Sequence, residues 1–290
     1  MTRYPAGLAI RARAPFLMRC FRRTSRWYRV KVMMEALGML RGAAHFPFHA
    51  SSVVVPMDEN EAWANGDFAR YNLTTVSNFA LACDRHLGAF DMIDCGAHLG
   101  LFGAQVATFS RGLRRIVAVE PNPEVFAYLE GNLRAGRTQD VQAVNAAVAG
   151  FAGRGRLTAP DYDLQSNQAL FLRPDPAGDI DVIRLDSLAD RVGPTLALKL
   201  DVEGAELEAL EASGDFVRSR ARLVLCVEVH RRVLARVGLT DTTLLAGINA
   251  VRPMRWVDAD HPEREIDPSR SVYEQAGVAQ QCDVIGFSVE

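Results

Sequence analysis

The stretch that decides the fold is Met92-Ile93-Asp94-Cys95-Gly96-Ala97-His98-Leu99-Gly100, followed by Ile116-Val117-Ala118-Val119-Glu120-Pro121-Asn122-Pro123. Each part starts with an apolar run typical of a buried parallel strand. The glycines predict a sharp turn into a helix, whose free N–H groups can hold a polar ligand. Glu120 ends the second run, so its carboxylate is expected beside the same crevice, where it can accept ribose hydroxyl hydrogens. Alternatively, the glycines only close a turn and Glu120 caps a helix, but the matching order and spacing favour a nucleotide site.

Strands and helices are expected to alternate from residue 91 onwards. Two predicted strands end at residues 95 and 120, and four more cover about 141–148, 182–186, 196–202 and 223–229. Predicted helices cover about 99–110 and 124–135, and another helix is expected to begin near residue 205. Residues 255–257 and 284–289 are spaced like a closing antiparallel pair. Residues 150–178 are expected to form an irregular excursion, with hairpin strands within it as an alternative. This alternation predicts an α/β fold with a parallel sheet and helices on both faces.

Composition excludes several classes of protein. The chain has 290 residues, of which 49% are hydrophobic, enough for one large α/β domain. No run of about 18 uncharged apolar residues occurs, and the arginine-rich start lacks the apolar core of a signal peptide, so we expect a cytoplasmic protein. Five scattered cysteines without a C-x-x-C pair argue against a disulfide framework or a structural zinc site. The net charge of −2 does not suggest a nucleic-acid binder.

The first 46 residues form a basic arm in which Glu35 is the only acid. Interleaved apolar side chains could make amphipathic helices that lie on an anionic membrane, a polyanionic substrate or a partner protein. The alternative is a helical extension packed on the main domain. The predicted domains are a basic, partly helical extension over 1–50 and a main domain over 51–290, divided into a lead-in (51–90), a core (91–230) and closing strands (231–290).

A second acidic motif, Leu198-Lys199-Leu200-Asp201-Val202-Glu203-Gly204-Ala205-Glu206, follows another apolar run. A period of two puts Lys199, Asp201 and Glu203 on one side of the strand's carboxyl end, which is the ligand crevice of a parallel sheet. A pair between Lys199 and Asp201 would reduce the cost of burying these charges. Attraction of Glu203 and Glu206 to a helix N-terminus explains the glutamates equally well, but not Lys199 and Asp201.

The next predicted strand ends in Cys226-Val227-Glu228-Val229-His230, which brings an acid and an imidazole to the same edge. Because imidazole titrates near neutrality, His230 is predicted to remove a proton from an attacking hydroxyl; helix capping is the alternative role. Asp201 and Glu228 would orient the acceptor or hold a cation. The carboxylates are scattered along the chain, so we predict no metal site.

Missing motifs narrow the chemistry further. The glycine pattern is G-x-x-x-G rather than G-x-G-x-x-G, and no Tyr-x-x-x-Lys pair occurs, which disfavours a nicotinamide dehydrogenase. The absence of Asn-Pro-Pro, Asp-Pro-Pro and Pro-Cys sequences disfavours methylation of a flipped nucleic-acid base.

From about residue 53 to 230 the chain resembles the FkbM-type S-adenosylmethionine-dependent methyltransferases. The shared motifs, in order, are D-x-G-A-x-x-G, V-x-E-P-N-P, the Asn132 helix, V-N-A-A-V, Leu185-Asp186, K-x-D-V-E-G-A-E and E-V-H. The resemblance implies a Rossmann-like class I methyltransferase sandwich, with a seven-stranded, mostly parallel sheet and an antiparallel C-terminal strand. It also implies S-adenosyl-L-methionine as cofactor.

The resemblance further implies roles for single residues. Asp94, Gly96 and Gly100 would cradle the methionine part of the cofactor, Glu120 would hold the ribose, and Asn122 and Asn145 would lie near the adenine. His98, Pro121 and Ala146 complete the predicted cofactor set. His98 stands where the family usually has asparagine, and its backbone could serve equally.

Members of the resembling family methylate hydroxyls on sugars, glycolipids or polyketide-like metabolites, so the expected partner is a small-molecule or glycan hydroxyl acceptor. The predicted catalytic residues are His230, Asp201, Lys199 and Glu228. Two alternatives stay open: a non-catalytic, methyltransferase-like binding or adaptor protein, and an N-methyltransferase, which needs no strong base.

Overall fold

The computed structural model describes residues 42–57, 67–136, 140–158 and 170–289, together with residues 29, 31, 33, 34, 37, 38, 40 and 59. Predictions about the basic arm as a whole, including its contact with a membrane or partner, fall outside these residues. Among the described residues, no helix is both long enough and apolar enough to cross a membrane.

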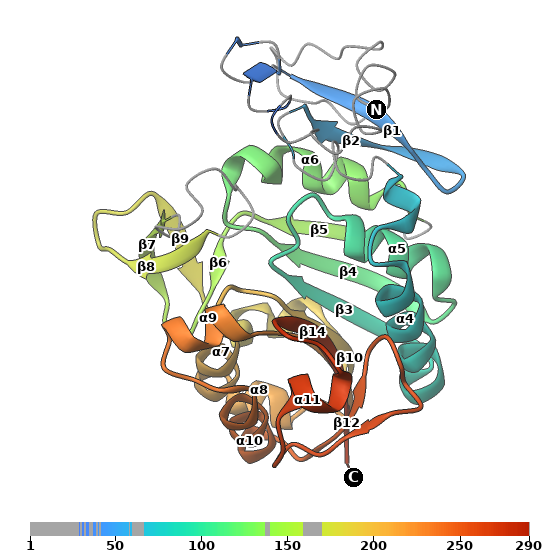
Figure 1. The fold of residues 1–290 in the computed structure, drawn as a ribbon, viewed down its shortest axis with the longest axis vertical. Helices are drawn as coiled ribbons and strands as arrows, with labels where there is room; N and C mark the ends of the chain where they lie inside the picture. The colour runs from blue at the N-terminus through green and yellow to red at the C-terminus, as the bar shows by residue number, and fades with distance from the viewer. Residues whose placement is uncertain are drawn as a thin grey trace.

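The centre of the fold is an eight-stranded sheet in the order β13-β12-β14-β11-β10-β3-β4-β5 (Figure 1). The strands are β3 (Phe90–Cys95), β4 (Leu113–Val119), β5 (Asp140–Val144), β10 (Thr195–Leu200), β11 (Arg222–His230), β12 (Met254–Asp258), β13 (Glu265–Ile266) and β14 (Gln281–Ser288). Strands β11, β10, β3, β4 and β5 are parallel neighbours, and β14 runs antiparallel between β11 and β12. Apart from the two-residue β13, this is the expected seven-stranded class I methyltransferase sheet.

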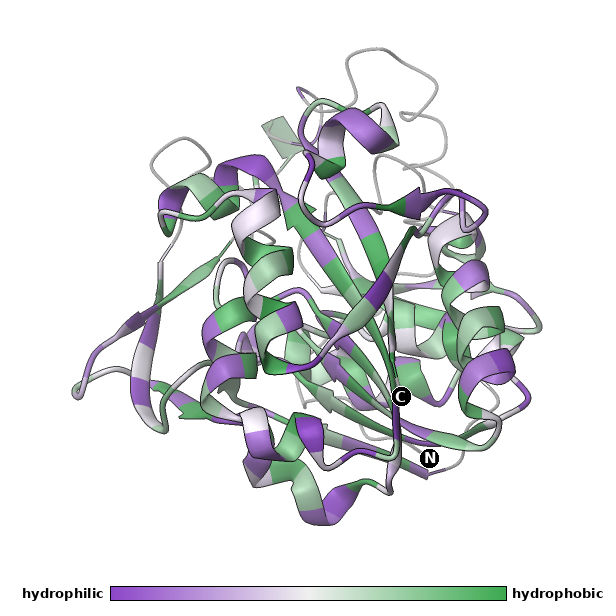
Figure 2. Ribbon diagram, turned by 90° about the horizontal axis from the view of Figure 1, so that it is seen from below, coloured by the Kyte–Doolittle hydropathy of each residue, from purple (hydrophilic) through white to green (hydrophobic). Residues whose placement is uncertain are grey.

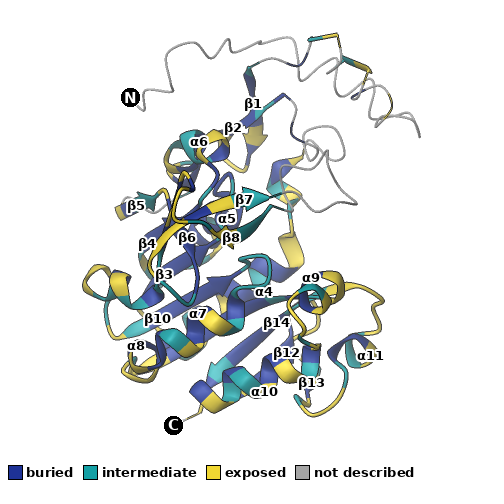
Figure 3. Cartoon of the chain, turned by 90° about the vertical axis from the view of Figure 1, so that its left-hand side faces the viewer, coloured by how far each residue is buried: buried dark blue, intermediate teal, exposed yellow. Residues whose placement is uncertain are grey.

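Helices cover both faces of the sheet. One face packs against α4 (Leu73–Leu87), α5 (Leu101–Phe109) and α6 (Pro123–Leu133); the other packs against α7 (Glu206–Ala212), α8 (Gly214–Arg218) and α10 (Asp241–Val251). Two short helices, α9 (Arg231–Arg236) and α11 (Val272–Ala276), and two 3-10 turns, η1 (Phe68–Arg70) and η2 (Leu185–Arg191), complete the layers. The central strands are almost entirely buried, and exposed residues collect on the outer helix surfaces (Figure 3). Apolar residues are likewise concentrated on the central strands, and hydrophilic residues on the outer surfaces of the helices (Figure 2).

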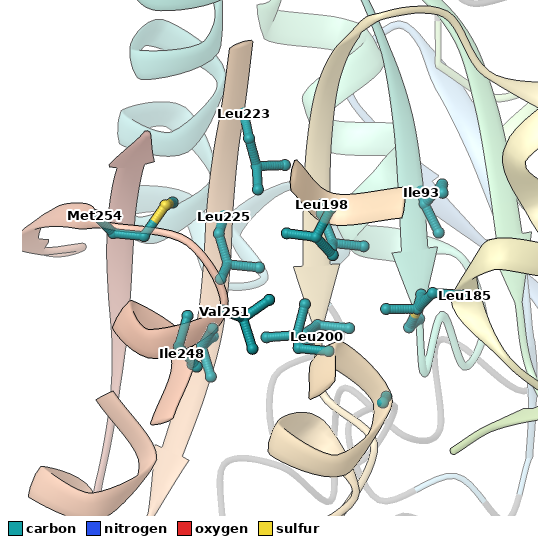
Figure 4. Close-up of a cluster of buried hydrophobic side chains, with 14 of the residues drawn as sticks. Ile93, Leu185, Leu198, Leu200, Leu223, Leu225, Ile248, Val251 and Met254 are labelled. Carbon is teal, nitrogen blue, oxygen red and sulfur yellow. The ribbon is translucent and has the colours of Figure 1, made fainter. Parts of the chain in front are cut away.

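Alternation along each strand divides the core into two layers. Leu198 and Leu200 of β10 pack with Ile248 and Val251 of α10 on one face (Figure 4). Ala197, one position away, packs in the opposite layer beside α4 and α5. Because side chains alternate along a strand, Lys199 shares the face of Ala197. A charged side chain thus enters the layer that contains α5.

Two additions surround this core. A hairpin of β1 (Ala43–Phe48) and β2 (Ser51–Pro56) packs on α5 and α6. A second sheet, in the order β6-β9-β7-β8, consists of β6 (Ala147–Val148), β7 (Gly153–Thr158), β8 (Phe171–Pro174) and β9 (Ile180–Ile183).

These additions correct two predictions. The domain boundary predicted at 50/51 cuts through the β1–β2 hairpin, whose strands are paired along their full length. The strand predicted over 141–148 is two strands in different sheets, because the chain leaves the strand at Asn145 and bends at Ala146. The irregular region expected over 150–178 contains the β7–β8 hairpin.

Candidate functional site

The glycine turn after β3 is left-handed at three of five positions. Gly96, His98 and Gly100 have φ values of +73°, +50° and +79°. Glycine tolerates this conformation, and among the other residues asparagine, aspartate and histidine adopt it most often. The backbone N–H of Gly100 closes the turn by donating to the carbonyl of Ala97 at 2.7 Å. Histidine therefore fits the backbone where the resembling family has asparagine.

Backbone groups hold Glu120 from both sides. Its Oε2 accepts a hydrogen bond from the N–H of His98 and its Oε1 from the N–H of Asn122, both at 2.8 Å. Burial raises the pKa of Glu120, and His98 acts in the opposite direction. Each carboxylate oxygen has a second lone pair, so Glu120 can still accept hydroxyl hydrogens from a ligand.

The side chain of Lys199 interacts with acidic residues near the ends of both β3 and β10. Its Nζ lies 3.0 Å from Oδ2 of Asp201 and 3.8 Å from Oδ1 of Asp94, and 5.3 Å from the ring centroid of Phe102. Burial lowers the pKa of Lys199, but the charges of Asp201 and Asp94 outweigh it, so the pKa is raised. Burial raises the pKa of Asp94, which is completely buried, whereas Lys199 lowers it. The ammonium group therefore stays charged at neutral pH.

A cavity of about 580 Å³ lies at the carboxyl ends of the parallel strands. This volume is typical of a small-molecule site. Near β4 and β5 it is lined by the glycine turn, by Glu120 and by the apolar side chains of Val119, Pro121, Ala146, Ala147 and Val148. Near β10, β11 and β14 the lining is mostly polar and includes Lys199, Asp201, Glu203, Glu228, His230, Arg232, Gln281 and Asp283. We call this second half the polar end.

Most of the predicted site residues line this cavity. All four predicted catalytic residues do, namely Lys199, Asp201, Glu228 and His230. From the predicted cofactor set, the lining residues are Gly96, His98, Glu120, Pro121, Asn122 and Ala146. The structure therefore brings together two groups of motifs that are about 100 residues apart in the sequence.

Three predicted cofactor residues, Asp94, Gly100 and Asn145, are not among those that line the cavity. Asp94 is buried beside Lys199, and Gly100 lies so close to Leu129 that a Cβ would be 2.8 Å from its Cδ1. The amide of Asn145 donates to the carbonyl of Glu120 at 2.8 Å. These three residues therefore lie behind the residues that line the cavity and hold them in position.

Carboxyl groups crowd the polar end. Burial, together with the charge of Asp201, raises the pKa of Glu203 and of Asp283 to about 7. Burial also raises the pKa of Glu228 well above its usual range, again with Asp201 adding to the effect. Arg236 lies 3.5 Å from Glu203. Within the described ranges, no group of three or more His, Cys, Asp or Glu side chains is arranged to hold a metal ion.

His230 caps a helix as well as lining the cavity. Its Nδ1 accepts a hydrogen bond from the backbone N–H of Val233 at 3.2 Å, at the start of α9. Burial lowers the pKa of His230, and the nearby cations Arg232 and Arg236 lower it further. With Nδ1 acting as acceptor, the neutral ring carries its proton on Nε2. The proton-acceptor role predicted for His230 is therefore opposed by its own capping bond.

Sequence motifs missed several lining residues, including Glu59, Tyr71, Phe102, Gln281 and Asp283. Oε2 of Glu59 lies 3.6 Å from Nε2 of His98. Gln281 and Asp283 begin the antiparallel strand β14, so the first residues of that strand reach the edge where the parallel strands end. The signal available in the sequence was a pair of polar residues directly before the predicted apolar strand.

Comparison with solved structures finds several methyltransferases similar to the chain. The chain is similar to an FkbM methyltransferase from Methylobacillus flagellatus KT at 18% identity and a TM-score of 0.44, with 69% of this chain and 43% of that chain covered. It is also similar to an O-methyltransferase from Bacillus cereus in complex with SAH, at 15% identity and a TM-score of 0.42, with 77% and 87% covered. The N-methyltransferase NodS from Bradyrhizobium japonicum WM9 has 12% identity and a TM-score of 0.41, with 76% and 96% covered.

The family assignment comes from the sequence itself. No curated protein is significantly similar to the chain, and the chain spans less than half the length of the Methylobacillus protein. A family model described as the methyltransferase FkbM domain matches residues 94–246, more than half of the 290 residues. This match includes the glycine turn, Glu120 and the motifs at the polar end. The chain belongs to the FkbM methyltransferase domain family.

Proposed function

We propose that this protein transfers a methyl group from S-adenosyl-L-methionine to a hydroxyl oxygen of a sugar, a glycolipid or polysaccharide precursor, or a secondary metabolite. The observation that carries the proposal is that one cavity joins the glycine turn and Glu120 to the polar groups at the ends of β10 and β11. A ligand held by the first half therefore meets the polar end directly.

The residues of the cavity fit S-adenosyl-L-methionine, which supplies an electrophilic methyl group on a positively charged sulfur. Glu120, fixed by two backbone N–H groups, would hold the ribose hydroxyls. The apolar lining after β4 and β5, which includes Pro121 and Ala146, suits a flat heterocycle.

The polar end also suits a hydroxyl acceptor. Carboxylates such as Asp201 and Glu228 can accept hydrogen bonds from hydroxyls, while Gln281 and Arg232 can donate to acceptor oxygens. An alcohol is a poor nucleophile, so positioning and proton removal are the two tasks that fall to these side chains. Both types of group are available at the polar end.

Calorimetry with S-adenosyl-L-methionine tests the first half of the proposal. Glu120→Gln keeps the shape of the side chain but removes its charge, and hydrogen bonds to a charged group contribute about 1.5–3 kcal/mol. We expect the affinity to fall about 10- to 100-fold. The matched control is Glu124→Gln, which changes an exposed glutamate in the first turn of α6 and should leave affinity unchanged.

Methyl transfer from isotopically labelled S-adenosyl-L-methionine to a panel of methyl glycosides and to primary amines tests the second half. We expect O-methyl products, identified by mass spectrometry. Products on nitrogen alone would make the protein an N-methyltransferase. Binding without transfer to any acceptor would favour the adaptor function, and absence of binding would refute the proposal.

A further inference from the structure

We propose that Glu228 and Asp283 form a carboxyl pair that takes up the proton of the acceptor hydroxyl, while His230 serves the site as a hydrogen-bond donor. This inference rests on the proposed function, because it names the proton acceptor of the same reaction. Asp283 lies outside residues 94–246, which match the family model. The pair therefore combines a motif residue with one supplied by the closing strand.

The sheet itself brings the two carboxyl groups together. Glu228 on β11 and Asp283 on β14 are directly opposite in the antiparallel register. Side chains of opposed residues share a face, with Cβ atoms about 4.5–5.5 Å apart, and both residues line the cavity. Two positions further along the register, Gln281 is opposite His230 and donates a side-chain hydrogen bond to Glu228. Glu228 is thereby fixed, with Asp283 beside it.

Mutual repulsion prepares the pair to share one proton. Two partly buried carboxyl groups on opposed residues cannot both ionise easily, and such groups titrate as a unit. Burial raises the pKa of Glu228 well above its usual range and that of Asp283 to about 7. Above about pH 7, one proton then resides on the pair and one carboxylate is free to accept another.

Other titratable groups surround the pair on several elements. They are Lys199 on β10, Asp201 and Glu203 after β10, Cys226 and His230 on β11, Asp260 after β12, Tyr273 on α11, and Cys282 on β14. Asp201 raises the pKa of both members, whereas Lys199 lowers both. The acids near the pair outnumber the single lysine, which favours retention of one shared proton.

His230 is poorly arranged to take the same proton. The lone pair on Nδ1 accepts the N–H of Val233, and the proton of the neutral ring is on Nε2. To accept a proton on Nδ1, the ring would have to give up its capping bond at the start of α9. The Nε2–H group can instead donate to the oxygen of the acceptor.

The step balances without any further reactant. The hydroxyl oxygen forms a bond to the methyl carbon as the bond between that carbon and sulfur breaks, and the hydroxyl proton passes to the ionised carboxylate of the pair. The positive charge on sulfur is lost, and the pair gains one proton. Water then removes this proton and restores the pair.

Methyl transfer by Glu228→Gln, Asp283→Asn and His230→Asn tests these roles, with the methyl glycoside acceptors named above. Loss of a general base typically costs about 10²- to 10⁴-fold, so we expect kcat to fall by this factor in Glu228→Gln and Asp283→Asn. Their affinity for S-adenosyl-L-methionine, measured by calorimetry, should stay within about threefold, because neither residue is assigned to the cofactor. The control Glu211→Gln changes an exposed glutamate on α7.

His230→Asn separates capping from proton transfer, because asparagine is also a good N-cap residue. We expect it to lower kcat by less than about tenfold, the effect of losing one hydrogen bond. Loss of transfer in His230→Asn, with transfer kept in Glu228→Gln, would overturn the proposal. In the wild type, kcat should fall as the pH drops through about 7, where the second carboxyl takes up its proton.

A measurement without turnover separates this inference from the proposed function. Carbon-13 NMR of protein labelled at the Asp and Glu carboxyl carbons follows both groups between pH 5 and 9, with assignment from the two amide variants. We expect Asp283→Asn to lower the midpoint of Glu228 by more than about one pH unit, which is the coupling that defines an interacting pair. An unchanged midpoint would refute the pair even if hydroxyls are methylated. Coupled titration without any O-methyl product would refute the proposed function and leave the pair without that role.

Discussion

Replacing Gly96 by alanine tests the closest contact between the two halves of the site. Gly96 has φ +73°, and a Cβ there would lie 1.8 Å from the backbone oxygen of Asp201. The left-handed backbone costs alanine about 1–2 kcal/mol, and forcing an extra methyl group into a packed region adds about 1–3 kcal/mol. We therefore expect Gly96→Ala to lower the free energy of unfolding by about 2–5 kcal/mol.

Gly277→Ala is the matched control for this variant. Gly277 also has φ +73°, but a Cβ there would meet nothing within 4 Å. Only the backbone cost of about 1–2 kcal/mol then applies. Urea unfolding of both variants isolates the steric contribution, and calorimetry with S-adenosyl-L-methionine should show weaker binding only in Gly96→Ala. Equal destabilisation of the two variants, within about 0.5 kcal/mol, would refute the reasoning.

Two further predictions concern stability. Asn132→Leu removes three hydrogen bonds that join the side chain to the N–H and carbonyl of Val54 and to the carbonyl of Leu99. Because these backbone groups would then be buried and unpaired, we expect the free energy of unfolding, measured in urea, to fall by about 2–4 kcal/mol. A loss below about 0.5 kcal/mol would contradict this expectation. Burial and Asp201 raise the pKa of Glu203 from 4.5 to about 7, so the native state binds this proton more tightly than the unfolded chain, and stability from this group falls as the pH rises from about 4.5 to about 7. Glu203→Gln should flatten that decline in urea midpoints measured from pH 5 to 8, whereas parallel curves would count against the raised pKa.

Local signals predicted most of the fold. The strands that end at Cys95, Val119 and Leu200 are apolar runs followed by turn residues, and such runs can be recognised from the local sequence alone. The hairpin strand Ala43–Phe48 was missed because it contains Pro47 and follows the basic arm. Its stability comes from pairing with β2 and packing on α5 and α6, which are contacts distant in the sequence.

The sequence likewise predicted some residues of the candidate site and missed others. Lys199 and Glu228 were found because each lies at the end of a parallel strand, where the edge of the sheet collects ligand-binding groups. Asp94 also lies near the end of a strand, but it is fully buried beside Lys199 and does not line the cavity. Asp283 was missed because it lies just before the predicted antiparallel strand, and the register that sets it opposite Glu228 depends on pairing between strands distant in the sequence.

The direction of β14 also decides where the protein can be attached to a surface. Its first residue, Gln281, is at the cavity, and the side-chain oxygen of its last, Ser288, accepts a hydrogen bond from the N–H of Leu223 near the start of β11. Eight residues of extended chain span about 25 Å, so position 289 lies at the opposite edge of the sheet, as the C-terminus in Figure 1 shows. An affinity tag or fluorophore joined after this position would leave the cavity mouth open to ligands in immobilised binding assays.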